Sequence, residues 1–97
     1  MLKPWCTELA EKHDAQPAEL FAASRDFKMA DVAIPAKQKV LMPLLSDAIQ
    51  VHPDGVKAIA QRARSLGASE ADICETLRVA YDCGGTPALI TGLNAFR

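Results

Sequence analysis

Residues 67–97 read GASEADICETLRVAYDCGGTPALITGLNAFR, and this stretch opens with the signals of a capped helix. Ser69 is expected to cap the helix, because its hydroxyl can accept a backbone N–H bond while the carboxylate of Asp72, three residues on, returns one. Five residues then recur at the i, i+3, i+4 spacing of a single helix face. They are Ile73, Cys74, Leu77, Ala80 and Tyr81. This pattern predicts a helix that packs one face against a core.

A second helix is expected directly after the first, so that the two form a C-terminal helical hairpin. Gly84 and Gly85 are expected to end the first helix, because glycine takes left-handed backbone angles without a steric penalty. Thr86 and Pro87 then supply an N-cap and a first helical residue. The second helix, to about Phe96, has no charged side chain. So large an apolar surface predicts burial, including burial against another subunit.

The composition is that of one small globular domain, residues 1–97. A chain of 97 residues buries only about 60–70% of its unfolded surface, so self-association would be a natural source of extra core. The net charge of −1 gives no excess of positive charge that would attract nucleic acid. No apolar run is long enough for a membrane span, and no secretory signal is expected. Three cysteines, an odd number, favour a reducing cytoplasm over a secreted disulfide framework.

The rest of the chain is also expected to be helical, because no run alternates with the period of a strand. Apolar periodicity predicts helices over residues 4–13, from 14 to about 28, over 35–52 and over 56–67, with a connection at 29–34 and a turn at 53–55. The second of these helices has Leu20, Phe21, Ser24 and Phe27 at helical spacing. Pro43 lies inside the third and is expected to bend it near Lys39, whose carbonyl it crowds. The predicted fold is all-α with about six helices.

The hairpin resembles the C-terminal half of the carboxymuconolactone decarboxylase and alkylhydroperoxidase D superfamily. Members show a small-residue turn, an acidic helix with an E-x-L-x-x-A pattern, and a GG-x-P-A turn. Here these are G-A-S from Gly67, E-T-L-R-V-A from Glu75 and G-G-T-P-A from Gly84. The resemblance extends in pattern over about residues 34–96. It implies a helical fold, assembly as a homotrimer or homohexamer, and either alkylhydroperoxidase or carboxymuconolactone decarboxylase activity.

The active-site residues of the redox branch are not present in this chain. That branch has C-x-x-C-x-x-x-H ahead of the small-residue turn and a glutamate twelve residues before the first cysteine. The cysteines attack and resolve a peroxide or disulfide, and the histidine and glutamate relay protons. In the register set by Gly67, the glutamate position holds Val40, the cysteine positions hold His52 and Gly55, and the histidine position holds Ile59. The resemblance therefore implies a member without thiol peroxidase activity.

The remaining cysteines are not expected to replace that pair. Cys74 and Cys83 are nine residues apart on one helix, which places them about 180° around it and some 13 Å along it. A disulfide needs Cα atoms within about 7 Å. Both are therefore interpreted as small core residues, and no role is assigned to Cys6.

His52 and Asp47 are the candidate catalytic residues, because His52 stands at a former nucleophile position and Asp47 precedes it by five residues. In one interpretation they are a general base and its partner. In the other, His52 ends one helix where the dipole favours it and Asp54 caps the next. No cofactor is expected, and no metal site, since His13, His52 and the cysteines lack the spacing of zinc ligands. The cations of the fourth helix are interpreted as its solvated face; they are Lys57, Arg62 and Arg64.

Two functions are compatible with these residues. The first is a binding or scaffold protein that has lost the redox cysteines and the proton relay. The second is an enzyme of the decarboxylase or hydratase type with a rebuilt pocket around His52 and Asp47. A small-molecule ligand at a subunit interface near His52 would favour the enzyme, whereas a pocket plugged by Val40 and Ile59 would favour the binding protein.

Overall fold

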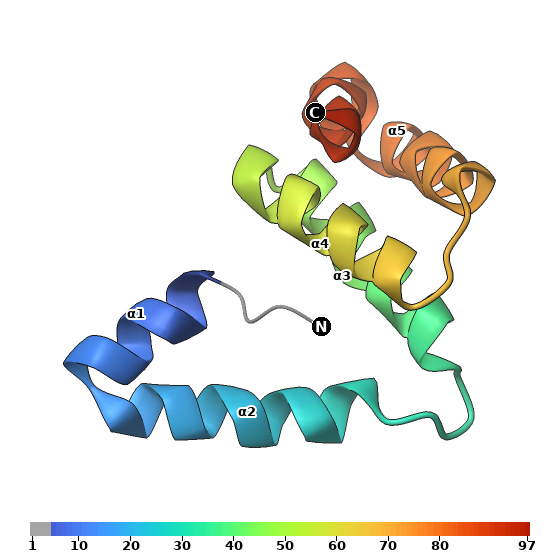
Figure 1. Ribbon diagram of the computed structural model, residues 1–97. Coiled ribbons are helices and arrows are strands. Elements are labelled where there is room, and N and C mark those ends of the chain that lie inside the picture. Colours follow the sequence, from blue (N-terminus) through green and yellow to red (C-terminus); the bar gives the residue numbers. More distant parts are fainter. Residues whose placement is uncertain (1–4) are drawn as a thin grey trace.

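The computed structural model of the protein describes residues 5–97, and of Trp5 only the backbone. Over this range the chain forms five α-helices and a 3₁₀ helix, without a strand (Figure 1). They are α1 (Trp5–His13), α2 (Ala15–Met29), α3 (Ala36–Ile49), α4 (Pro53–Ser65), α5 (Glu70–Gly92) and η1 (Leu93–Phe96). The predicted all-α class is confirmed, and so is the connection after α2. The predicted start of the first helix at Pro4 lies outside the described residues.

The helices divide into two regions. The α3–η1 body, residues 36–96, is packed around α3, whereas the α1–α2 arm, residues 5–29, projects from it and packs mainly on itself (Figure 1). The radius of gyration is 13.8 Å, against about 12.5 Å for a compact domain of this length. The accessible surface is 6418 Å², against about 5,400 Å² for a compact monomer of this mass. The arm therefore makes the molecule less compact than a typical small domain.

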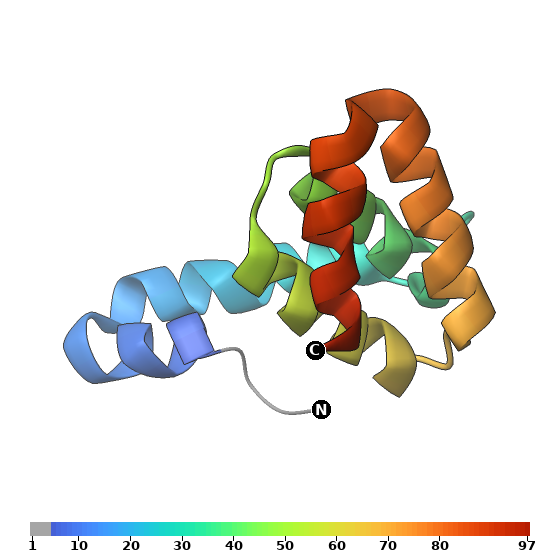
Figure 2. The ribbon, with the colours of Figure 1, turned by 90° about the horizontal axis from the view of Figure 1, so that it is seen from above.

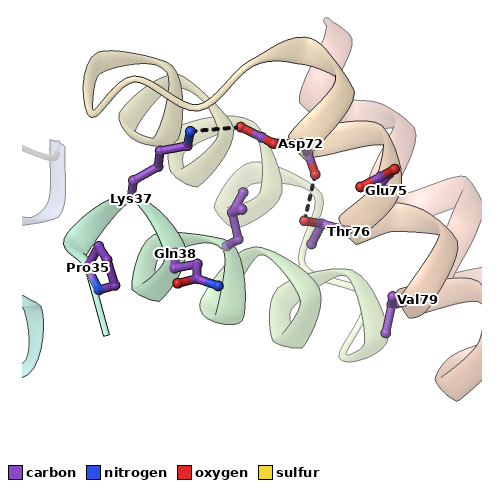
Figure 3. A pocket seen from close by; sticks show the side chains of 8 residues that line it. Pro35, Lys37, Gln38, Asp72, Glu75, Thr76 and Val79 are labelled. Atoms are coloured by element: carbon purple, nitrogen blue, oxygen red, sulfur yellow. Dashed lines mark hydrogen bonds and ion pairs between the residues drawn. The ribbon is translucent and has the colours of Figure 1, made fainter. Parts of the chain in front are cut away.

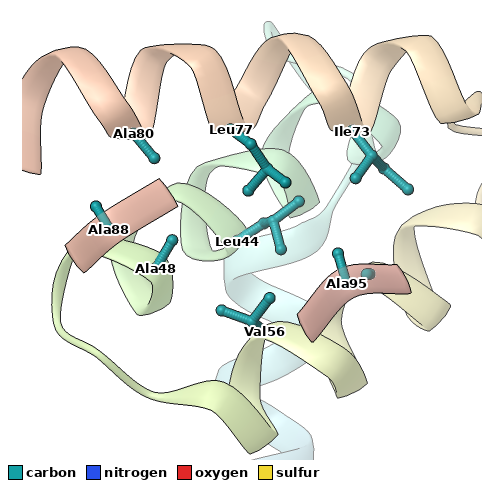
Figure 4. Close-up of a cluster of buried hydrophobic side chains, with 9 residues drawn as sticks. Leu44, Ala48, Val56, Ile73, Leu77, Ala80, Ala88 and Ala95 are labelled. Atoms are coloured by element: carbon teal, nitrogen blue, oxygen red, sulfur yellow. The ribbon is translucent and has the colours of Figure 1, made fainter. Parts of the chain in front are cut away.

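The hydrophobic core lies inside the body, where α3 is flanked by α4 and α5 (Figure 4). Leu44 of α3 points towards Val56 of α4 and Leu77 of α5. Burying a side chain of this size stabilises the fold by about 1.5–3 kcal/mol. The buried cluster consists of Leu44, Ala48, Val56, Ala60, Ile73, Leu77, Ala80, Ala88 and Ala95. The apolar stripe of α3, which carries Leu44 and Ala48, thus faces the core.

The C-terminal hairpin is formed within α5. The capping box is present, since the backbone N–H of Asp72 donates to Ser69 Oγ (3.0 Å) and that of Ser69 donates to Asp72 Oδ2 (2.9 Å). Gly85, at φ 75° and ψ −163°, breaks the helical path, and the two halves of α5 meet there at an angle (Figure 2). A Cβ at Gly92 would lie 2.5 Å from Leu77 Cδ2. The halves therefore pack together through a glycine contact.

The second helix forms as predicted but does not bury its predicted face. Leu20 is 70% exposed, Phe27 is 85% exposed, and Phe21 and Ser24 are exposed as well. The buried residue of α2 is Ala18. Helical periodicity indicates that a face exists, but it does not supply an element to cover it.

Three predictions about the chain between and within the later helices are corrected. Residues 53–55 are the first turn of α4, because proline is preorganised for the first helical position. The chain reverses just before, where Val51 has φ 62°. Asp54 does not cap α4, whose N-cap position is held by His52 without a side-chain bond. Tyr81 is half exposed. By contrast, α3 runs through Pro43 without a break, and the bend near Lys39 stays a prediction.

Candidate functional site

The two relay positions of the superfamily lie together and are apolar. Val40 of α3 is 1% exposed, and Ile59 of α4 packs against the small cluster that Val40 forms with Ala63 and Ala68. Neither side chain can carry a proton, because both are hydrocarbons. The two helices thus meet through hydrophobic contact at the place where a redox member needs ionisable groups.

The two cysteine positions lie at the corner between α3 and α4. His52 Nδ1 is 3.4 Å from Asp47 Oδ1, and the backbone N–H of His52 donates to the Asp47 carbonyl (2.9 Å). The side chains of these two candidate residues are therefore in contact, and their catalytic role stays a prediction. The His52 side chain is 56% exposed and that of Asp47 is 25% exposed. Val51 between them takes left-handed angles, which are rare for a β-branched residue.

Only glycine fits at position 55 without a shift, because Asp47 approaches it closely. A Cβ on Gly55 would lie 2.0 Å from Asp47 Oδ2, so any side chain there would displace the carboxylate. The carboxylate sits beside the first turn of α4, where the helix dipole favours negative charge. Asp47 is seven residues from Val40 on α3, about two turns or roughly 10 Å along the axis. The corner and the apolar relay positions are therefore separate places.

The three cysteines are all free and exposed. The interpretation of Cys74 and Cys83 as core residues is wrong. Cys74 follows the buried Ile73 and falls one position off the stripe that continues with Leu77 and Ala80. Within residues 5–97, no three His, Cys, Asp or Glu side chains are grouped so that they could hold a metal ion.

A first cavity, of about 520 Å³, lies between the start of α3 and the first half of α5 (Figure 3). Three of its polar side chains already serve the fold, those of Lys37, Asp72 and Thr76. Asp72 accepts from Ser69 and is 3.5 Å from Lys37 Nζ, while Thr76 Oγ1 donates to the Asp72 carbonyl (2.8 Å). The backbone and hydroxyl bonds with Ser69 and the charge of Lys37 hold the pKa of Asp72 below its usual range. This cavity is thus a gap beside a helix cap.

A second cavity, the α2–α3–α4 cavity, has a volume of about 480 Å³. It is lined by Phe21, Ser24, Arg25, Lys28, Met29, Lys39, Val40, Met42, Pro43, Ile59 and Arg62. Four of these residues are cations and none of them is Asp or Glu. The interpretation of Arg62 as part of a solvated face is therefore wrong. The sequence signal was hidden because Arg25 and Lys28 belong to α2, which approaches α3 and α4 only in the folded chain.

Arg64 also departs from the predicted solvated face. Its guanidinium donates to both oxygens of Glu70 (2.6 and 3.0 Å) and to the Ala95 carbonyl (2.9 Å). Arg64 therefore joins α4 to the start of α5 and to η1. The third cation of that helix, Lys57, is exposed as predicted. In the part of the chain that the structure describes, no helix is both long and apolar enough to cross a membrane.

The arrangement of these helices is shared with known proteins. A proposed carboxymuconolactone decarboxylase from Burkholderia xenovorans superposes with a TM-score of 0.84 at 20% identity, over 96% of this chain and 74% of that one. A carboxymuconolactone decarboxylase family protein from Legionella pneumophila superposes with a TM-score of 0.79 at 25% identity, over 93% of this chain and 82% of that one. No curated protein sequence was found to match the chain.

The fold is therefore that of the all-α proteins to which these two structures belong. The model of the carboxymuconolactone decarboxylase family matches residues 16–97, which include all of the α3–η1 body and nearly all of α2. The chain belongs to the carboxymuconolactone decarboxylase family. The resemblance inferred from the hairpin is confirmed.

Proposed function

We propose that this protein is a non-peroxidatic member of the family that works by binding, as a ligand-binding or scaffold protein. The observation that carries the proposal is the packing of Val40, 1% exposed, with Ile59 at the two relay positions. With hydrocarbon side chains at these two positions, neither position has a group that could activate a thiol or protonate a leaving group. The family fold is then retained as a framework whose cavity holds a ligand.

The positions of the thiols support this proposal. Thiol peroxidase chemistry needs an attacking thiolate, a resolving thiol and a base within hydrogen-bond reach. Cys74 and Cys83 lie nine residues apart in the first half of α5, which is some 13 Å along a helix and beyond the reach of a disulfide. His52 and Gly55 at the cysteine positions have no thiol.

A thiol-coupled peroxidase assay on the full chain tests the proposal. The expected result is no peroxide reduction above background and no intramolecular disulfide after mild oxidation. Turnover that is lost when Cys74 or Cys83 is changed to Ser would overturn it. The peroxidase activity of the double variant His52→Cys with Gly55→Cys is expected to be feeble, even if its two thiols form a disulfide. The variant still lacks the relay, and general acid–base help is worth about 10²–10⁴-fold.

The alternative is a decarboxylase or hydratase type of enzyme that uses the corner. One observation favours it, namely the 3.4 Å contact between His52 Nδ1 and Asp47 Oδ1 with the histidine open to solvent. Release of CO₂ from carboxymuconolactone tests the decarboxylase form of this alternative. The leading proposal expects none. Release that is abolished by His52→Gln and by Asp47→Asn would establish the alternative.

We further propose that the chain self-associates as a homotrimer or homohexamer. The support is the apolar surface that one copy leaves uncovered, on Leu20 and Phe27 of the arm and on Ile90, Leu93 and Phe96 at the end of the body. Light scattering is expected to give three or six times the chain mass. A mass near 10.4 kDa at micromolar concentration would contradict this.

A further inference from the structure

The α2–α3–α4 cavity collects positive charge from three helices. Arg25 and Lys28 come from α2, Lys39 from α3 and Arg62 from α4, and no carboxylate side chain lines the cavity with them. Like charges that share a partly desolvated space repel one another. Burial lowers the pKa of Arg62, and the neighbouring charge of Arg25 lowers it further. The fold thus tolerates an arrangement that an anion would stabilise.

Little of this charge is neutralised within the chain. Over the described residues, neither Arg25, Lys28 nor Arg62 forms an ion pair with an acid. Lys39 Nζ donates to the Ala30 carbonyl (2.7 Å), which is uncharged. Arg62 Nε is buried and has no hydrogen-bond partner in that part of the chain. A buried charged donor left unpaired is destabilising. Arg64, two residues along, shows the contrasting case of an arginine whose Nε and Nη2 both have hydrogen-bond partners.

The remaining walls of the cavity are apolar. Val40 is buried, Ile59 and Met29 are half-buried, and Phe21 and Met42 lie exposed at its rim. The volume of about 480 Å³ falls within the range of roughly 300–1,000 Å³ that is typical of small-molecule sites. A ligand that suits both parts needs an anionic head and an apolar tail.

We propose that the α2–α3–α4 cavity binds an amphipathic anion. Its carboxylate or phosphate head lies against Arg25, Lys28 and Arg62, and its hydrocarbon part lies against Val40 and Ile59. Guanidinium groups suit such heads because their planar donors bind two oxygens at once. The inference rests on the proposed function, since it names the ligand class of a protein that acts by binding.

Calorimetric titration of the full chain tests the ligand class with five probes, each kept below its micellar concentration. Decanoate and decyl phosphate are expected to bind. The ratio of their dissociation constants tells which head group is preferred. Decanol is expected to bind at least tenfold more weakly than the better anion, decylamine not at all, and inorganic phosphate far more weakly than decyl phosphate. Decanol binding as tightly as both anions, or phosphate as tightly as decyl phosphate, would overturn the proposal.

Variants test the location. Arg25→Gln and Arg62→Gln are each expected to weaken binding of the better anion at least tenfold. Arg78→Gln and Lys57→Gln remove exposed cations outside the cavity. These two variants are expected to leave binding of the anion unchanged. Thermal unfolding and light scattering check that each variant keeps its fold and its mass. Lys28→Gln, on the exposed rim, replaces Arg62→Gln if that variant fails to fold. Equal losses in the cavity and control variants would mean that only net charge matters, and would overturn the site.

The two proposals fail in different ways. Peroxide turnover in a protein whose anion binding is lost in Arg25→Gln would overturn the proposed function and leave this site standing. No turnover together with no anion binding would overturn the site alone.

Discussion

The α3–η1 body and the α1–α2 arm are both made of amphipathic helices, yet their apolar side chains end in different surroundings. Leu44 of α3 is fully buried between α4 and α5. Leu20 of α2 is 70% exposed, although it too belongs to an apolar set at helical spacing. A helix in the body has neighbours on two sides, whereas α2 has α1 and only the edge of α3. Helical periodicity therefore indicates which face seeks burial, and the arrangement of the other helices decides whether it is buried.

A matched pair of truncations tests most directly whether apolar side chains are buried in the body and exposed in the arm. Leu44→Ala is expected to lower the free energy of unfolding by about 2–5 kcal/mol, because it leaves a cavity in the core. Leu20→Ala is expected to change it by no more than about 0.5 kcal/mol. Urea denaturation at a concentration where the chain is monomeric measures both. If Leu20→Ala is as damaging as Leu44→Ala in the monomer, then Leu20 is buried within a single copy and the contrast between body and arm fails.

A second test concerns packing inside the body. Gly92→Ala places a methyl group against Leu77 Cδ2, at a position 2.5 Å away, and is expected to cost about 1–3 kcal/mol through overpacking. Combining it with Leu77→Val is expected to cost less than the sum of the two single changes, because the smaller side chain makes room. Strict additivity in a double-mutant cycle would show that the two residues do not touch.

The two helix caps extend the comparison to hydrogen bonds. Ser69→Ala removes the cap of α5 and is expected to cost about 1 kcal/mol, because α5 unfolds together with the core. Asp14→Ala removes the cap of α2, where the carboxylate accepts from the backbone N–H of Gln16 (3.3 Å). Its effect on global unfolding is expected to be smaller, since the arm can fray alone. Hydrogen exchange of the amides in α2 and α5 separates local from global opening, and equal global losses would contradict this view.

The smallest expected effect is on the pH dependence of stability. The pKa of Asp72 is lowered by its bonds with Ser69 and by Lys37, and that of Glu70 by its bond and charge contact with Arg64. A depressed folded-state pKa gives stability that is present above the unfolded value, about 4, and is lost as the pH falls through the folded value. The free energy of unfolding is thus expected to fall in acid. Asp72→Asn and Glu70→Gln are each expected to flatten that fall, and an unchanged slope in both would contradict the assignment.

The fold was largely readable from the sequence because its signals are local. The capping box at Ser69, the reversal at Gly85 and the stripe of α3 each depend on residues a few positions apart. The contact of His52 with Asp47 was foreseen for the same reason. The cationic cavity was not, because Arg25 and Arg62 are 37 residues apart and meet only when α2 passes α3. The exposure of Cys74 was also missed, since one position on a helix is a rotation of about 100°.

The place of η1 in the core has a consequence for synthesis of the chain. Ala95 is part of the buried cluster in Figure 4, and its carbonyl receives the bond from Arg64. The arm is made first and η1 is made after every other element of the body. During translation at about 5–20 residues per second, α3 and α4 are made before the surface that completes them exists. The nascent protein therefore exposes the apolar side chains of the arm, such as Phe27, during the whole interval before its core can form. These are the side chains that a chaperone would meet first.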